Sequence, residues 1–293
     1  MTLRYLPLGL LALALATALP SRAVAAPDTA ATPVTKPAPG MLGLTGTHTK
    51  EPMHLNADGG IEWQQGTKSY IARKNAVATR GNVTLRADTI TAYYRDAAKS
   101  GDTEVWRVVA AGGVKITTPS QSVVGDVATY DLDNALVVVT GSAIRLVTPQ
   151  DVVTARDSLE WYDHKQLAVA RGKAAVKHGV RTVRGDVLAA QLVTVSGQPA
   201  KVSKVNAVGH VQVAGPGQRG TGDKGVYDAK TGKVTLRGHV VLVRGENTLT
   251  GEYGVVDLSQ GVSRLMPAGG DDTRVHGYIV PQQKGGSGDE NPR

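Results

Sequence analysis

The chain has 293 residues and a formal net charge of +8, with 35 glycines but neither cysteine nor phenylalanine. The missing cysteines exclude disulfides, zinc–thiolate sites and thiol catalysis, and the length allows one large β domain or two small ones. The positive charge is explained most simply by a solubilising surface, although it also suits anionic partners such as phosphorylated lipids.

The N-terminal segment has the pattern of a secretory signal peptide. Arg4 precedes an apolar run, residues 6–19, which is followed by the small residues of Ala23-Val24-Ala25. We expect cleavage after Ala25, because a cut one residue later would leave Pro27 at the first mature position. The apolar run is short for a membrane span. The sequence therefore predicts an exported protein. Residues 26–51 are predicted to be a disordered linker rich in Pro, Thr and Ala, and residues 281–293 a disordered tail.

Between these limits the sequence predicts strands and almost no helix. Short runs of Val, Thr, Ile and Leu alternate with polar residues and are bounded by Gly, Asn and Asp. In residues 81–94 one alternating strand is expected to end at the step Ala87-Asp88, and a second to begin at Thr89. Comparable steps follow at spacings from 29 (Asp157 to Asp186) to 38 residues (Asp88 to Asp126). They are Gly125-Asp126, Arg156-Asp157, Gly185-Asp186, Gly222-Asp223 and Gly251-Glu252. A period of this size predicts a stacked architecture.

The residues that follow each step define one apolar face. Those two and four positions beyond the acid share a face of the strand, because strand side chains repeat every second residue. They are Ile90 and Ala92, Ala128 and Tyr130, Leu159 and Trp161, Leu188 and Ala190, Gly225 and Tyr227, and Gly254 and Val256. A module of two short strands cannot bury such a face alone. Stacked modules would form an elongated roll with a continuous apolar interior and unpaired strand edges at both ends. The pattern continues past Val195, so residues 52–280 are predicted to form either one roll or two lobes, about 52–195 and 205–280.

The sequence contains no recognisable catalytic or metal-binding motif. Nucleophile-elbow, Walker, zincin and dinucleotide fingerprints are missing, and the seven histidines are scattered. We therefore expect no enzyme activity, no cofactor and no metal. The Asp of each step is expected to fix a tight turn. Basic residues are dispersed without stacking aromatics, which disfavours nucleic-acid binding. A Val/Leu/Ile interior suits an aliphatic ligand, but ordinary core packing explains it as well.

Two stretches resemble the opening of the LptA/OstA-like family, the periplasmic lipopolysaccharide-transport proteins of Gram-negative bacteria. They are residues 52–58, PMHLNAD, and residues 81–90, GNVTLRADTI. Residues 205–211, followed by Gly222-Asp223, and residues 236–240 look like further copies of the same pattern. The resemblance covers roughly residues 52–265. It implies a periplasmic β-jellyroll, open at both ends, whose apolar groove receives the acyl chains of lipid A. It also implies end-to-end self-association, and docking through edge strands to inner-membrane-anchored and outer-membrane transport components.

For the groove we select residues in phase with the apolar face. They are Leu55, Ile61, Val83, Leu85, Ile90, Val114, Ile116, Ala128, Tyr130, Leu159 and Trp161. Core packing is an equally open interpretation of this set. Arg73, Arg86 and Lys115 are candidates for phosphate contacts at the rim. The alternative function is that of an exported structural or adhesive β-solenoid without lipid cargo. A polysaccharide-acting enzyme on a β-helix would need clustered carboxylates, which the regular spacing of the Asp residues does not suggest.

Overall fold

A computed structural model describes residues 52–96, 103–194, 200–257, 262–267 and 274–280. All of these residues belong to one compact unit, residues 37–293. The predicted signal peptide, linker and C-terminal tail (residues 1–25, 26–51 and 281–293) lie outside the described residues.

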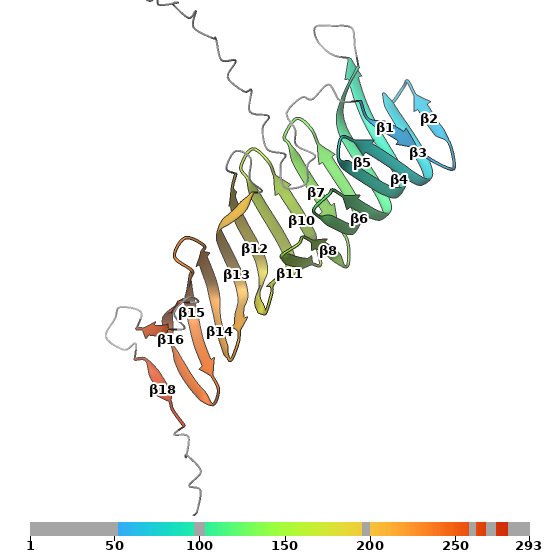
Figure 1. Ribbon diagram of the computed structural model, residues 1–293. Helices are drawn as coiled ribbons and strands as arrows, with labels where there is room; N and C mark the ends of the chain where they lie inside the picture. Colours follow the sequence, from blue (N-terminus) through green and yellow to red (C-terminus); the bar gives the residue numbers. More distant parts are fainter. Residues whose placement is uncertain (1–51, 97–102, 195–199, 258–261, 268–273, 281–293) are drawn as a thin grey trace, which may run out of the picture. The chain divides into compact units, whose positions relative to one another are not determined.

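Every regular element in the described ranges is a β-strand, and all strand pairs are antiparallel (Figure 1). The strands are β1 (His54–Asn56), β2 (Ile61–Gln64), β3 (Ser69–Arg80), β4 (Val83–Asp96), β5 (Thr103–Thr117), β6 (Ser122–Asp131), β7 (Leu136–Thr140), β8 (Ile144–Val147), β9 (Asp151–Ala155), β10 (Ser158–Tyr162), β11 (Leu167–His178), β12 (Arg181–Val193), β13 (Lys201–Gly215), β14 (Gln218–Asp228), β15 (Lys233–Arg244), β16 (Asn247–Asp257), β17 (Val262–Met266) and β18 (His276–Tyr278). The described part holds no helix able to cross a membrane. The predicted fold class, an all-β roll of stacked antiparallel strands, is confirmed.

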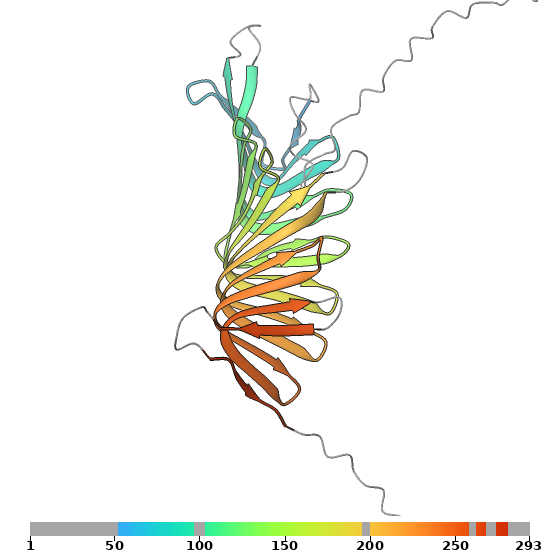
Figure 2. The ribbon, with the colours of Figure 1, turned by 90° about the vertical axis from the view of Figure 1, so that its left-hand side faces the viewer.

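The sheet is folded in half along a line of β-bulges. Pairing shifts register near the middle of the long strands, for example between Arg86 and Thr89 on β4 and between Thr221 and Lys224 on β14. Each long strand therefore contributes one half to each of two layers. Layer 1 contains β1, β8, β9, β18 and the strand halves that pair with them. Layer 2 contains β2, β7, β10, β17 and the other halves. We call the line of bulges the corner; Figure 2 shows the strands bending back along it.

Glycine and aspartate shape the corner. Gly209 on β13 has a φ of +76° and Gly238 on β15 a φ of +75°, values that favour glycine. Asp186 and Asp223 come from the neighbouring strands, and their carboxylates fill the space that a Cβ on either glycine would need. The prediction that a step separates two short strands is therefore wrong. β4 runs unbroken from Val83 to Asp96, and the Asp holds a bend in the adjacent strand because a folded sheet must kink every strand at the same level.

Two continuous apolar rows line the inside of the fold. In layer 1 the cross-strand row runs Leu55, Ala78, Leu85, Ile116, Val123, Leu146, Val153, Val176, Val183, Val213, Gly220, Leu242, Leu249 and Gly277. In layer 2 it runs Ile61, Ala72, Ile90, Ala110, Ala128, Val139, Leu159, Ala170, Leu188, Ala207, Gly225, Leu236, Gly254 and Leu265. The predicted apolar face is thus confirmed, since Ile90, Leu159 and Leu188 are all buried.

The sheet is continuous from end to end. β12 pairs with β13, so the strands on either side of residues 195–199 belong to the same sheet. Residues 103–104 begin β5, and residues 201–204 begin β13.

Candidate functional site

Most of the predicted groove residues lie together in the interior. Seven are buried in one hydrophobic core, and three more pack against it while partly exposed. The buried ones are Val83, Ile90, Val114, Ile116, Ala128, Leu159 and Trp161; the partly buried ones are Leu55, Leu85 and Tyr130. Ile61 is different, because it sits on the terminal strand β2 with 49% of its surface exposed. At the ten inner positions the two layers pack against each other. Lipid contact there remains a prediction.

An open space between the strands lies toward the C-terminal end. A cavity of about 280 Å³ is bordered by β13–β16 and the residues around β17 and β18. Its apolar lining includes Val213, Leu242, Leu249 and Val256. Gly220 stands between Val213 and Leu242 in the inner row of layer 1 and leaves the interior without a side chain at that position. This cavity was not predicted from the sequence, although the glycines of β14 and β16 are the signal that could have located it.

The border of the cavity is polar. Two arginines, Arg219 and Arg244, contribute to its wall, as do Gln218 and Asn247. Ile279, just beyond β18, also borders the cavity and is 71% exposed. An apolar wall with cations at its border matches an amphiphile that has alkyl chains and an anionic head.

One buried polar group in the core lacks a partner. The indole Nε1 of Trp161 has no hydrogen-bond acceptor among the described residues, although the side chain is only 3% exposed. A buried donor without an acceptor costs about 1–3 kcal/mol. Burial also raises the pKa of the nearby Tyr130 phenol, since the charged form would lose its hydration. Neither group forms a catalytic constellation with its neighbours.

The two ends of the stack present strands with one paired side. At the N-terminal end β1 and β2 each pair with β3, and β2 carries Trp63, which is 58% exposed. The Trp63 indole donates a hydrogen bond of 2.6 Å to the Tyr94 hydroxyl and stacks on Tyr70 at 5.9 Å between centroids. At the C-terminal end β17 and β18 each pair with β16. Such edges can accept a further strand.

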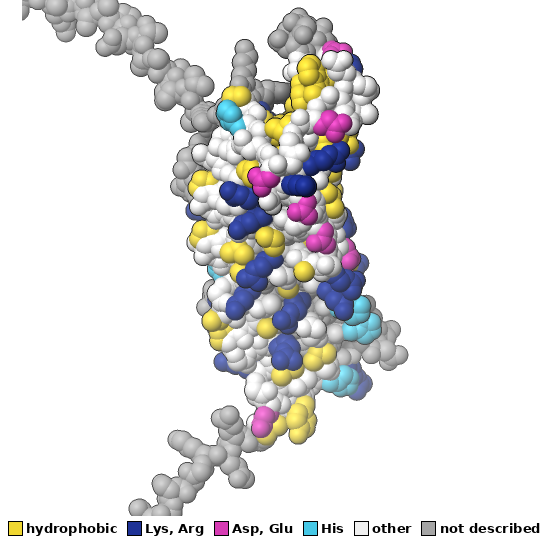
Figure 3. All heavy atoms as spheres, turned by 90° about the vertical axis from the view of Figure 1, so that its right-hand side faces the viewer, with side chains coloured by type: hydrophobic (Ala, Val, Ile, Leu, Met, Phe, Trp, Pro, Cys, Tyr) yellow, Lys and Arg dark blue, Asp and Glu magenta, His cyan; other side chains and the backbone are white. Residues whose placement is uncertain are grey.

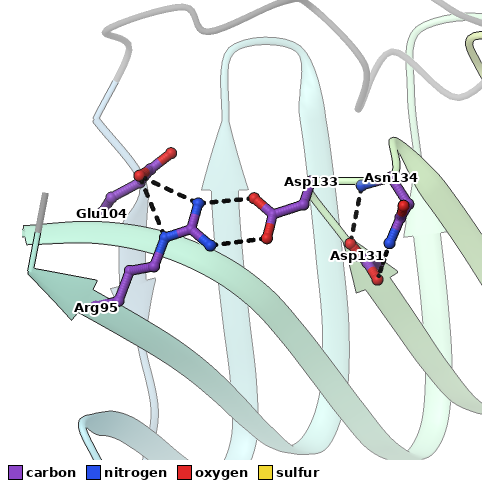
Figure 4. A network of polar contacts seen from close by, with 5 residues as sticks. All are labelled: Arg95, Glu104, Asp131, Asp133 and Asn134. Carbon is purple, nitrogen blue, oxygen red and sulfur yellow. Dashed lines mark hydrogen bonds and ion pairs between the residues drawn. The ribbon is translucent and has the colours of Figure 1, made fainter. Parts of the chain in front are cut away.

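A polar network holds the layer-2 margin opposite the corner (Figure 4). Arg95, on β4, makes two hydrogen bonds of 2.8 Å to the carboxylate of Asp133, in the turn after β6. It also contacts Glu104 on β5 at 3.3 Å. These interactions raise the pKa of the guanidinium, with the Asp133 bond as the largest cause. Exposed pairs contribute little stability, so this network fixes strand ends and has no evident chemical role.

The three predicted phosphate ligands do not share one location. Arg73 lies on the outer face of layer 2, 3.5 Å from Glu62. Arg86 and Lys115 face each other across β4 and β5 on the outer face of layer 1. Their strand phase turns all three side chains away from the apolar interior, and phosphate contact at these residues remains a prediction. The described residues contain no group of three or more His, Asp or Glu side chains suited to a metal.

The described residues thus form an antiparallel roll with an apolar interior. Comparison with protein families then identifies the group. The chain belongs to the family described as "LptA/(LptD N-terminal domain) LPS transport protein", whose model matches twice, over residues 56–157 and 153–262.

Among solved structures, the chain is similar to LptH from Pseudomonas aeruginosa. That protein is described as the LptA homologous periplasmic component of the conserved lipopolysaccharide transport device. The identity is 21%, the TM-score is 0.40, and the alignment covers 45% of this chain and 95% of the other. No curated protein gave a significant match.

Proposed function

We propose that this chain is a periplasmic lipopolysaccharide-binding protein that shields the acyl chains of lipid A between its two layers during export. The observation that carries the proposal is the pair of continuous apolar rows from the first strands to the last, beside a cavity lined by Val213, Leu242 and Leu249. Each methylene kept out of water is worth about 0.8 kcal/mol. A many-chained lipid therefore needs a path without aqueous gaps, and rows of this kind supply one.

The arrangement of hydrogen bonds favours opening along one side. The backbone pairing joins neighbouring strands within each layer, and the layers are linked covalently through the bent strands at the corner. Between the inner faces, the described contacts are apolar side chains. Moving the layers apart would break these contacts and no ladder hydrogen bonds, and acyl chains could replace them with similar contacts. The buried residues selected from the sequence would then line the path.

The terminal strands support the second part of the proposal. With one paired side each, β2 at one end and β17 and β18 at the other can add a strand from another molecule. We infer end-to-end stacking with further copies and with the related inner-membrane-anchored and outer-membrane components, which would bridge the two membranes. No catalytic step is required of this chain.

Site-specific photo-crosslinking in cells tests the lipid path. A photoreactive residue at Leu249 would face the cavity, whereas one at the next position, Thr250, would face outward on the same strand. We expect lipopolysaccharide adducts from position 249 and none from position 250. Equal labelling at both sites would contradict the proposal, as would adducts with protein alone at 249. The latter result would favour a structural solenoid without lipid cargo.

A further inference from the structure

The outer faces of the two layers differ in charge. On layer 1, five exposed cations lie on strands β4, β5, β8, β11 and β12, with β6 and β9 between them, and we call them the cationic band. They are Arg86, Lys115, Arg145, Lys177 and Arg184. In Figure 3, Lys and Arg side chains run along one face of the molecule, and Asp, Glu and His side chains lie mainly toward the borders of that face.

Layer 2 presents mixed charges on its outer face. Arg107 faces Asp131 in the strand register, and Lys204 faces Asp228. Glu160 forms an ion pair with Arg171 at 2.8 Å. These positive charges of layer 2 are thus compensated by its own carboxylates, whereas Lys224 and Arg237 face each other without one in the register.

The cations of the band have no such compensation. None of the five forms an ion pair with a described residue. Arg86 and Lys115 stand directly opposite each other, a like-charge pair that destabilises a sheet. The nearest carboxylates on the same strands, Asp88 and Asp186, belong to the corner, where they pack on the bent strands. The band therefore carries a repulsion that an external anion would relieve.

The shape of the face narrows the choice of anion. Neighbouring strands are about 4.8 Å apart, so a band from β4 to β12 extends for roughly 30 Å. The positions between the cations carry short side chains, among them Val124, Thr154 and Ala175. Neither the cavity beside β13–β16 nor a smaller one lined by Val205 and Val234 includes a residue of the band. A small phosphate compound would therefore meet only the outer side chains of a sheet here. A glycan would find few hydrogen-bond donors and no aromatic platform between the cations. A lipid surface needs only charge and a flat approach.

We propose that the outer face of layer 1 docks on the surface of a bilayer that carries anionic phospholipid headgroups, through the cationic band. This surface is separate from the apolar interior, and the inference stands without the proposed lipid path. Each basic residue near an anionic membrane contributes about a 5-fold gain in affinity at physiological salt. The attraction should weaken as salt shortens the screening length.

Vesicle co-sedimentation with the full chain tests the proposal. The probe is a set of vesicles of phosphatidylglycerol and phosphatidylcholine, with pure phosphatidylcholine vesicles as reference. The band variant carries Arg86→Gln, Lys115→Gln, Arg145→Gln and Arg184→Gln. The control variant removes the same charge from layer 2 and carries Arg107→Gln, Lys204→Gln, Lys224→Gln and Lys233→Gln.

We expect the unmodified chain to bind the anionic vesicles only. The band variant should lose binding roughly several hundredfold, and the control variant should lose less than about tenfold. Equal losses in both variants would show that net charge alone acts and would overturn the proposal. Binding of the unmodified chain to heparin but not to anionic vesicles would assign the band to a linear polyanion and also overturn it. Circular dichroism and thermal melting of both variants separate misfolding from lost affinity.

Discussion

Substitution of the corner glycine Gly209 by alanine tests how the sheet is folded. At φ +76° a side chain costs about 1–2 kcal/mol. A methyl group there would also overlap with the carboxylate of Asp186, which accepts a 2.8 Å hydrogen bond from His210 Nδ1. Forcing that carboxylate off its rotamer adds about 0.5–1.5 kcal/mol. We therefore expect Gly209→Ala to lower the free energy of unfolding by about 1.5–3.5 kcal/mol.

Urea denaturation gives this quantity, and Gly217→Ala is the matched control. Gly217 also has a positive φ, +68°, but an added Cβ would meet nothing within 4 Å, so only the backbone cost of about 1–2 kcal/mol applies. In an Asp186→Ala background the overlap with the carboxylate is gone and only the Asp186 Cβ position, 2.9 Å away, remains close, so the cost of Gly209→Ala should fall toward that of Gly217→Ala. The expectation is contradicted if Gly209→Ala lowers the free energy of unfolding by no more than Gly217→Ala does. It is also contradicted if removal of the Asp186 carboxylate leaves the difference between the two losses unchanged.

Three further predictions concern the core, the corner and the cavity. Trp161→Phe should lower the free energy of unfolding by less than about 1 kcal/mol in urea, because it deletes an unpartnered donor. Leu159→Ala should lower it by about 2–5 kcal/mol, because it leaves a cavity in the core. The reverse order would contradict the description of Trp161 Nε1 as a buried donor without an acceptor. Asp223 raises the pKa of His239 above 6.5, so the stability from this pair is full below pH 6.5 and is lost as pH rises through the folded-state pKa; an NMR titration showing no raised pKa would refute it. Gly220→Leu should displace the side-chain ends of Leu236 and Leu242, 2.9 and 3.1 Å from its Cβ, reach into the cavity and weaken lipopolysaccharide binding in a pull-down, whereas the outward change Thr221→Leu should not. Thermal melting checks that both variants fold, and equal binding by both folded variants would refute the cavity's role.

The strand content and the apolar face could be predicted because both follow from local alternation. Ile90, Leu159 and Leu188 stand two residues beyond an acid, and period 2 places them on one face whatever the partner strands are. The repeat of the steps likewise predicted stacked units. These features need no knowledge of long-range pairing.

The bend at each step could not be predicted from local alternation. Ala87-Asp88 resembles the end of a strand, because the residues typical of turns are also those that allow a bulge. Only the register shows that the carboxylate of Asp186 packs on Gly209, 23 residues later in the chain. The outward orientation of Arg86 and Lys115 follows from the alternation of side chains along a strand, so it could have been predicted from the sequence. That the two residues lie directly opposite each other depends on how β4 and β5 pair.

We propose that the two layers part along the side opposite the corner to admit acyl chains. The two ends of β15 measure this movement, because Lys233 lies in layer 2, Val243 lies in layer 1, and both side chains point outward. The sequence has no cysteine, so spin labels can be attached at two introduced cysteines without background. A pair within layer 2, at Lys204 and Lys233, serves as the control.

Pulsed electron paramagnetic resonance would then compare the distances with and without bound lipopolysaccharide. We predict that the Lys233–Val243 distance lengthens on binding while the Lys204–Lys233 distance stays constant. An unchanged Lys233–Val243 distance in a sample with lipopolysaccharide bound would contradict the account.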